Sequence, residues 1–234
     1  QPGMQGFPGF SPTEAVDDGR DSWAVYLDAE TNLSEKFLLG AAVRFEDYSD
    51  FGNTTTGKLS ARFDATEAFA VRGTLSTGFR APGVQQLFYS QRSTNLNSDG
   101  VLTDTLTARQ DSDVTRAFGI EPLQEETSTS GTLGFVYTPN DRLSVTLDVF
   151  QIDIDDRIIF SSNIAPESVG TDGNPCTPTN SNCPIQAILA PIGVGQVLFF
   201  TNAIDTRTTG VDLTVNHNTT FQGGSTLNLT ALVH

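Results

Sequence analysis

Few side chains in this sequence could carry out catalysis. His217 and His234 are the only histidines, and neither lies near a serine or cysteine motif that could act as a nucleophile. Nucleophilic catalysis requires a hydroxyl or thiol beside a base that a carboxylate orients. Carboxylates are numerous, but glycoside hydrolysis needs two of them at a defined separation across a cleft. The sequence therefore predicts no catalytic residue, no enzyme activity and no cofactor.

The two cysteines lie close together in the chain. Six residues separate Cys176 from Cys183, in a stretch rich in proline, asparagine and threonine that contains no histidine. A metal site of cysteines would be expected to draw on nearby imidazoles, whereas an isolated close pair suits a disulfide in an oxidising compartment. We predict a local Cys176–Cys183 disulfide and no metal site.

Charge and composition exclude several classes of protein. The formal net charge is −15, and nucleic acid phosphates require a basic surface instead. No run of apolar residues approaches the roughly 18 that a membrane-spanning helix needs. If the protein crosses a membrane, strands must do it.

Apolar side chains recur at every second position within segments between residues 23 and 79, and charged side chains fall between them. This period of two is typical of strands with one apolar and one charged face. Eight strands are predicted, at about 22–33, 37–48, 58–65, 69–80, 126–138, 142–159, 197–216 and 225–233. The apolar parity switches after Val149, which indicates a bulge or an exit from a bilayer, and Gly210 is expected to mark a bend or bulge.

The connections between these strands alternate in length. Tight turns alternate with a connection at 47–57 and with two long stretches, 81–125 and 161–196, which we expect to be structureless loops. An outer-membrane barrel has tight periplasmic turns and long external loops. We therefore predict an all-β fold, an antiparallel transmembrane β-barrel segment. A soluble β-sandwich module and a passive porin or adhesin barrel share the alternation and stay open as alternatives.

Several short strings resemble a known family. In chain order they are TGFRAP (77–82), QLF (86–88), LQEETS (123–128), LDVFQIDIDDRI (147–158), FFTNA (199–203) and TGVDL (209–213). Together these strings resemble the barrel of TonB-dependent outer-membrane receptors, and the resemblance covers roughly residues 20–234.

The resemblance implies a barrel of about 22 strands. Residues 1–234 would then be a fragment of it, with eight strands, external loops 81–125 and 161–196, and no plug domain. It also implies an active transport receptor in the outer membrane of a Gram-negative bacterium, importing a scarce small molecule or metal chelate, most commonly a ferric siderophore. The implied partners are outer-membrane lipid and the TonB–ExbB–ExbD system, which acts through the plug.

A small set of residues forms the predicted site. Arg44, Arg62 and Arg72 lie on the charged face and are expected to point into the lumen, with Glu46 and Asp64 as their cross-strand partners. The candidate substrate contacts are Arg80, Phe88 and Tyr89. For each of these three a structural role is the alternative: Arg80 as a solvated strand end, and the two aromatic rings as anchors of the loop on the barrel rim.

Overall fold

The computed structural model describes residues 15–96, 100–177 and 182–234. The chain divides into two compact units. The first, here called the sheet unit, comprises Asp21–Arg80, Glu126–Asp155 and Asp205–His234. The second, here called the loop unit, contains the described residues of Ala81–Glu125 and Asp156–Ile204, together with residues 15–20. Within the described ranges, no helix is long and apolar enough to cross a membrane.

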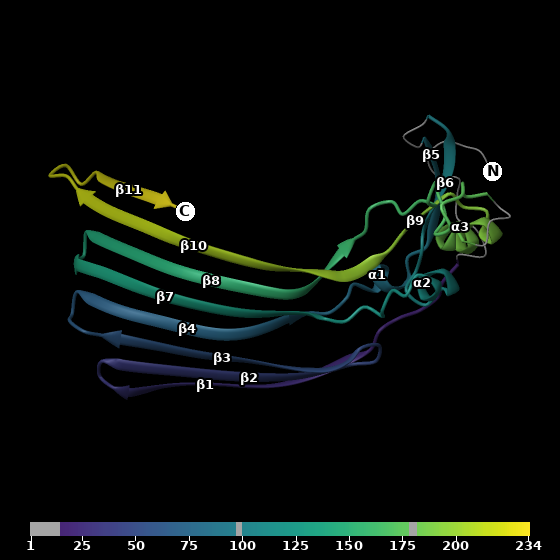
Figure 1. The fold of residues 1–234 in the computed structure, drawn as a ribbon. Coiled ribbons are helices and arrows are strands. Elements are labelled where there is room, and N and C mark those ends of the chain that lie inside the picture. The colour runs from purple at the N-terminus through teal and green to yellow at the C-terminus, as the bar shows by residue number, and fades with distance from the viewer. Residues whose placement is uncertain (1–14, 97–99, 178–181) are drawn as a thin grey trace. The chain divides into compact units, whose positions relative to one another are not determined.

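Eight long strands lie side by side in one antiparallel sheet (Figure 1). In sheet order they are β1 (Ser22–Ser34), β2 (Phe37–Tyr48), β3 (Gly52–Asp64), β4 (Phe69–Arg80), β7 (Glu126–Asn140), β8 (Leu143–Phe160), β10 (Phe200–Thr220) and β11 (Thr226–Val233). Consecutive strands in this order are neighbours, so each long connection leaves one strand and returns to the strand beside it, the first from β4 to β7 and the second from β8 to β10. The predicted fold class, an antiparallel all-β sheet of eight strands, is confirmed.

Side chains fix the turns at one end of this sheet. Asn140 Oδ1 accepts hydrogen bonds from the backbone N–H groups of Arg142 (2.9 Å) and Leu143 (3.2 Å) between β7 and β8. The Thr66 hydroxyl accepts from the N–H groups of Ala68 and Phe69 in the same way between β3 and β4. Short polar side chains that bond to nearby backbone groups favour such turns.

The predicted start of the third strand was wrong. β3 begins at Gly52, six positions before the predicted residue 58, and pairs with β2 from the Gly52–Tyr48 position onwards. The intervening run Thr54–Thr56 contains no apolar alternation, so periodicity could not detect it. Threonine is β-branched and suits a strand, and pairing with β2 supplies the rest.

The parity switch in β8 does not involve a bulge. β8 pairs with β7 without interruption from Thr127–Asp155 to Tyr137–Val145, so Phe150 and Ile152 lie on the same face as Asp148. Gly210 is not among the glycines with a positive φ. A Cβ built on it would lie 2.7 Å from Cε1 of Phe150, so the glycine leaves room for that ring.

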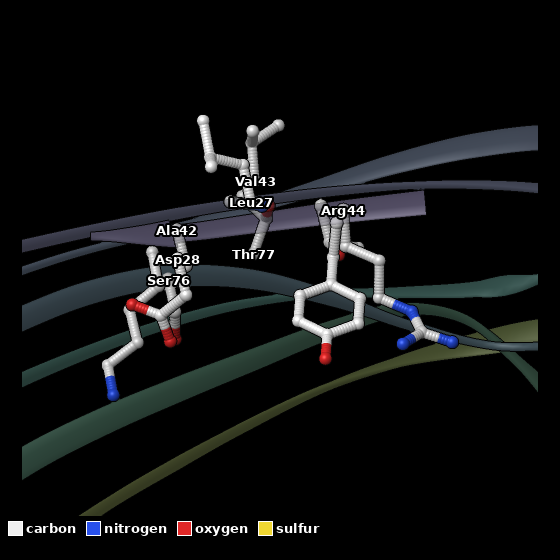
Figure 2. A pocket seen from close by; sticks show the side chains of 11 residues that line it. Leu27, Asp28, Ala42, Val43, Arg44, Ser76 and Thr77 are labelled. Atoms are coloured by element: carbon white, nitrogen blue, oxygen red, sulfur yellow. The ribbon is translucent and has the colours of Figure 1, made fainter. Parts of the chain in front are cut away.

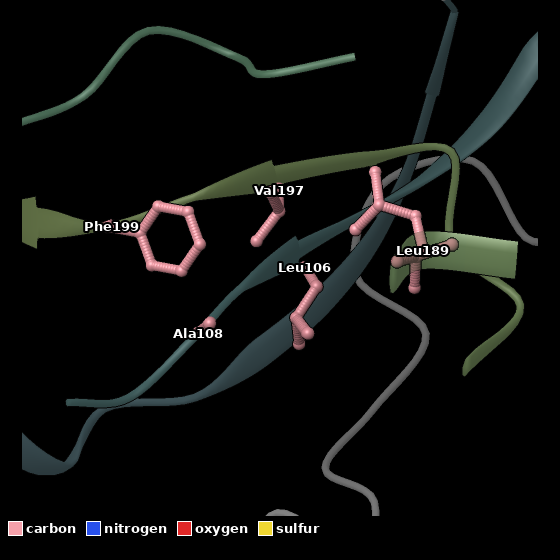
Figure 3. Close-up of a cluster of buried hydrophobic side chains, with 6 residues drawn as sticks. Leu106, Ala108, Leu189, Val197 and Phe199 are labelled. Atoms are coloured by element: carbon pink, nitrogen blue, oxygen red, sulfur yellow. The ribbon is translucent and has the colours of Figure 1, made fainter. Parts of the chain in front are cut away.

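The loop unit has its own secondary structure and its own core. Its described residues form a three-stranded sheet in the order β5 (Gln91–Leu96), β6 (Leu102–Thr107) and β9 (Gln196–Leu198). They also form the short helices α1 (Val84–Phe88), α2 (Asp113–Ala117) and α3 (Pro184–Leu189) and the 3-10 helix η2 (Ala190–Ile192). β6 and β9 pair in parallel although they come from different long connections. The buried side chains around this pairing are Leu106, Ala108, Leu189, Val194, Val197 and Phe199 (Figure 3).

The expectation of two structureless loops was therefore wrong, because the two connections fold against each other. The predicted strand 197–216 is also divided in the structure: β9 joins the small sheet and β10 the large one, with Phe199 between them. Phe199 is fully buried, and its ring centroid lies 5.2 Å from that of Phe118. This aromatic contact fixes the point at which the chain passes from one sheet to the other.

Candidate functional site

One face of the large sheet is apolar and largely uncovered. Leu27 (68% exposed), Leu59 (59%) and Leu75 (67%) project from it. In Figure 2 the side chains of Leu27 and Val43 point to one side of the sheet, whereas Arg44 points to the other. Large exposed apolar surfaces on soluble proteins are uncommon, but a strand surface of this kind suits contact with lipid.

Aromatic side chains gather toward both ends of this apolar face. Trp23 and Phe45 pack with ring centroids 5.4 Å apart, and the Trp23 Nε1–H donates to an Asp47 carboxylate oxygen at 3.1 Å. Toward the opposite strand ends, the rings of Phe69 and Phe135 stack with centroids 6.3 Å apart. Transmembrane barrels carry aromatic girdles at the two borders of their apolar band, and this arrangement matches that pattern.

The opposite face carries the predicted arginines, and carboxylates neutralise all of them. Arg44 pairs with Glu46, and Arg62 pairs with Asp64 at 2.8 Å. Both partners are the predicted ones, but each lies two residues along the same strand rather than across to a neighbouring strand. Arg62 and Arg72 are directly opposite each other in the β3–β4 register. Because like charges at such positions repel, each arginine needs its own carboxylate.

The partner of Arg72 lies two strands away. Arg72 faces Gly134 on β7, and Gly134 in turn faces Asp148 on β8. Across the glycine, the Arg72 guanidinium donates to both carboxylate oxygens of Asp148, at 2.9 and 2.7 Å. A Cβ on residue 134 would lie 2.7 Å from Nε of Arg72. Gly134 therefore provides the space through which this ion pair joins three strands.

Arg80, one of the three predicted substrate contacts, is held at the end of β4. It faces Glu126 across the β4–β7 pair, and its Nε–H donates to the Glu126 carboxylate at 2.9 Å, with a second contact from Nη2. The Glu126 side chain is only 7% exposed, whereas that of Arg80 is 57% exposed. A bidentate pair of this kind fixes the orientation of the guanidinium.

Hydroxyl groups occupy the charged face between these ion pairs. Ser60, Thr74 and Thr132 lie opposite one another on three neighbouring strands, and Ser76 faces Ser130 in the next row of the same face. Hydroxyls donate and accept hydrogen bonds without carrying charge. This face therefore offers a hydrophilic surface whose arginines are already paired.

Phe88 and Tyr89, the other two predicted contacts, belong to the loop unit. Phe88 ends α1, and Tyr89 follows it with 39% of its surface exposed. Nearby in the same unit a pocket of about 400 Å³ is bordered by Arg92, Arg109 and Arg116. Neither of the predicted aromatic residues lines it.

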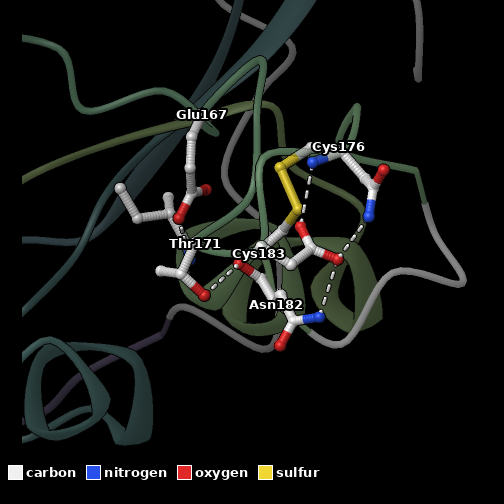
Figure 4. The surroundings of a disulfide bond; sticks show 8 residues. Glu167, Thr171, Cys176, Asn182 and Cys183 are labelled. Atoms are coloured by element: carbon white, nitrogen blue, oxygen red, sulfur yellow. Dashed lines mark hydrogen bonds between the residues drawn. A yellow bond between two sulfur atoms is a disulfide. The ribbon is translucent and has the colours of Figure 1, made fainter.

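The predicted disulfide is present in the loop unit. Cys176 and Cys183 are bonded, with their Cα atoms 5.8 Å apart (Figure 4). Cys183 is fully buried and immediately precedes α3. A Glu167 carboxylate oxygen accepts a hydrogen bond from the Ile185 N–H at 3.2 Å, which satisfies one of the open donors of that helix. The disulfide thus links Cys176 to the start of α3, the helix that contributes Leu189 to the core.

Across the three described ranges, no three residues among His, Cys, Asp and Glu are grouped so as to hold a metal ion.

Sequence reasoning missed Asp148, Glu126 and the arginines around the loop pocket. The register of β4 with β7 places Arg80 opposite Glu126. Sequence periodicity does not give that register, because the two strands are separated by the connection 81–125. Asp148 was visible as the one charge within an otherwise uncharged alternating segment. For Arg92, Arg109 and Arg116 the available signal was three basic side chains within an acidic stretch.

Comparison with known proteins identifies the family. Residues 2–232 match the family described as TonB dependent receptor-like, beta-barrel. The chain is 26% identical over 136 residues to the iron-regulated outer membrane virulence protein of Vibrio cholerae, a match covering 58% of this chain and 18% of that protein. It is 30% identical over 76 residues to the vitamin B12 transporter BtuB of Vibrio vulnificus, covering 32% of this chain and 12% of that protein.

Solved structures share the fold at low identity. A double mutant of the ferric enterobactin receptor PfeA from Pseudomonas aeruginosa superimposes with a TM-score of 0.62 at 17% identity, covering 97% of this chain and 29% of that one. The siderophore receptor PirA from the same organism gives 0.57 at 18% identity, covering 92% and 34%. The chain spans less than a fifth of the length of the curated relatives named above.

These matches agree with the two-faced antiparallel sheet and confirm the resemblance seen in the sequence. The family consists of transporters rather than enzymes, and its members reside in the outer membrane of Gram-negative bacteria. The chain belongs to the β-barrel domain of the TonB-dependent receptors.

Proposed function

We propose that this chain is part of an active outer-membrane receptor that binds a ferric siderophore and imports it with energy from the TonB–ExbB–ExbD system. The observation that carries the proposal is the sheet with one lipid-compatible face and one hydrophilic face, in a chain of this family. Similarity to a ferric enterobactin receptor and to an iron-regulated outer-membrane protein supports iron as the cargo. The partial identity to a vitamin B12 transporter makes cobalamin the substrate to test against it.

In this proposal the sheet unit is a segment of the barrel wall, with Arg44, Arg62 and Arg72 on its lumenal side. The loop unit is external and contacts the substrate, with Arg80 at the junction of strand and loop and with Phe88 and Tyr89 in the loop. TonB acts in this proposal through the plug domain that the family resemblance implies.

Uptake measurements test the function. Cells expressing the full-length receptor should accumulate radiolabelled ferric siderophore when TonB is present and lose that uptake when TonB is deleted. Uptake that persists without TonB would support a passive porin, and TonB-dependent uptake of cobalamin alone would replace the proposed substrate.

Labelling of intact cells tests the topology. Glu121 is exposed in the loop unit, and Asn140 lies in a tight turn between β7 and β8. A membrane-impermeant thiol reagent should label the Glu121→Cys variant and leave the Asn140→Cys variant unlabelled. The native cysteines do not interfere, because they are bonded to each other. The reverse pattern would contradict the proposed orientation.

A further inference from the structure

The two long connections join the large sheet at neighbouring strands. The first connection ends at Glu125, where β7 begins, and the second begins at Asp156, beyond the β7–β8 pairing, and ends at Ile204 within β10. Because β7, β8 and β10 are adjacent in the sheet (Figure 1), three of the points at which the chain enters or leaves the loop unit belong to adjacent strands. One side chain at this level is enough to bind both connections.

Asn202 is that side chain. Its Oδ1 atom accepts a hydrogen bond from the Gln124 N–H at 3.0 Å, and its Nδ2 group donates to the Gln124 carbonyl oxygen at 3.1 Å. The same Nδ2 group donates to the Asp156 carbonyl oxygen at 2.6 Å. An asparagine amide has two N–H donors and one acceptor oxygen, so these contacts use all three. Asn202, near the end of the second connection, thus binds the end of the first connection and the start of the second.

The backbone at Asp156 shows why a fastening is useful there. Asp156 is the one non-glycine residue with a positive φ, 56°, in the described ranges. This left-handed conformation costs an L-residue free energy, although aspartate tolerates it better than most residues do. The preceding residue, Asp155, is the last of β8 that pairs with β7. A strained residue of this kind persists only where its surroundings hold it, and the hydrogen bond from Asn202 holds its carbonyl group.

Further contacts join the two connections along their length. β6 of the first pairs with β9 of the second, and the buried core takes Leu106 from the first and Leu189 and Val197 from the second. The Gln110 side-chain amide donates to the Phe200 carbonyl oxygen at 2.7 Å. Displacing one connection alone would break the shared sheet and open the shared core. Closely packed elements of this kind shift as whole bodies rather than deform continuously.

We propose that the two connections act as one body, with Asn202 as a clasp at its base, so that a displacement of either connection carries the other with it. This coupling goes beyond the proposed function, because it holds whichever substrate the receptor imports. Independent loops, each able to close by itself, are the alternative that the experiments separate from it.

Spin-label distances in the purified full-length receptor test the clasp. Labels on Glu121→Cys and Ser162→Cys, which are exposed residues of the first and second connections, should give a single narrow distance. Asn202→Ala removes all three hydrogen bonds, and Asn202→Asp keeps only the acceptor and sets a carboxylate oxygen against two carbonyl groups. Both variants should lose the single narrow distance. Gln124→Ala is the matched control and should keep it, because Asn202 binds only the backbone of Gln124.

Two results of this measurement count against the proposal. Several distances or a broad distribution in the wild type overturns the coupling. A distance that stays narrow and unchanged in both Asn202 variants overturns the role of Asn202 as the clasp.

A cross-link tests the coupling without any change at Asn202. Thr107 and Leu198 are neighbours in the β6–β9 register, so Thr107→Cys combined with Leu198→Cys should form a disulfide that joins the two connections. If the connections act as one body, cells with the oxidised variant should take up radiolabelled ferric siderophore as fast as the wild type. Uptake that is lost in the oxidised variant and returns on reduction overturns the coupling, with reduced wild type as the control. Failure of the two new cysteines to join overturns it as well.

The outcomes separate the coupling from the proposed function. If wild-type cells take up no ferric siderophore in a TonB-dependent manner, the proposed function fails, and the spin-label distances alone decide the coupling. If wild-type uptake depends on TonB and the cross-link reversibly abolishes it, the function stands and the coupling fails.

Discussion

The two units of this chain differ in whether their large apolar side chains are exposed or buried. In the sheet unit, Leu27 and Leu75 remain about two-thirds exposed, at 68% and 67%. In the loop unit, Leu189, Val197 and Phe199 are fully buried. The sheet needs an apolar solvent on one side, whereas the loop unit folds around its own core as water-soluble domains do. The same residue types therefore have different energetic roles in the two units.

The largest expected effect lies in the core of the loop unit. Phe199→Ala removes a fully buried ring from beside Phe118 and should lower the local stability by about 3–5 kcal/mol. Hydrogen exchange should then become faster at the backbone amides of β6 and β9, with the large sheet unchanged. Phe63, 47% exposed on the apolar face, is the matched control, and Phe63→Ala should leave the loop amides protected. Unchanged exchange in Phe199→Ala would show that the loop unit does not depend on this core.

The next effect concerns the face that we assign to lipid. Leu75→Arg or Val43→Arg places a charge on that face and should cost about 2–4 kcal/mol if the position is near the bilayer midplane. Thr74→Arg places the same charge among the hydroxyls of the opposite face, where it should be tolerated far better. The folded fraction in lipid vesicles, read from heat-dependent gel mobility, measures both. Equal losses at positions 74 and 75 would remove the distinction between the two faces.

Alternation predicted the strands of the sheet unit well because the two faces of each strand carry side chains of different polarity. The predicted segments 37–48 and 69–80 have the same bounds as β2 and β4. In both strands, alternate side chains lie on the same face of the sheet and share its polarity. The method failed at Thr54–Thr56, where neither face carries apolar residues. Polarity alone therefore identifies a strand only when its two faces differ.

Prediction of the loop unit failed for a physical reason. The Thr105–Gln196 pair joins residues 91 positions apart, and neither connection shows a period that reveals its partner. The candidate site divides in the same way. The arginines of the sheet were identified because they alternate with the apolar residues along each strand. The pocket around Arg92, in contrast, depends on the way the two connections fold together.

The loop unit contains a disulfide, Cys176–Cys183, and the sheet unit contains no cysteine. A ring this short should stabilise the connection by about 2–3 kcal/mol through loop-closure entropy. The Cys176→Ser and Cys183→Ser double variant should therefore increase proteolysis of the segment before α3 while the sheet stays intact. Intact mass before and after reduction shows whether the bond forms in the native receptor. Unchanged proteolysis would mean that the core and the Glu167 contact to α3 suffice.

The smallest expected effect tests how the sheet unit stabilises its charged face. Gly134→Ala places a Cβ within 2.8 Å of Cγ of Arg72 and should displace the Arg72–Asp148 pair, whose side chains are 48% and 21% exposed. Partly exposed pairs contribute little, so we expect a loss of about 1 kcal/mol from the pair and the local crowding together. Gly73→Ala is the control, because its Cβ would meet only the Thr132 carbonyl oxygen at an ordinary 3.6 Å.

A double-mutant cycle then separates the ion pair from the crowding. If Gly134 serves the pair, Gly134→Ala should cost less in an Asp148→Ala background than in the wild type, because the pair is already lost. Heat-dependent gel mobility of the four proteins in lipid vesicles gives the coupling. Equal costs in the two backgrounds would show that the glycine serves strand packing alone. A clear coupling would instead show that the charged face is held together by contacts across three strands, whereas the apolar face relies on its solvent.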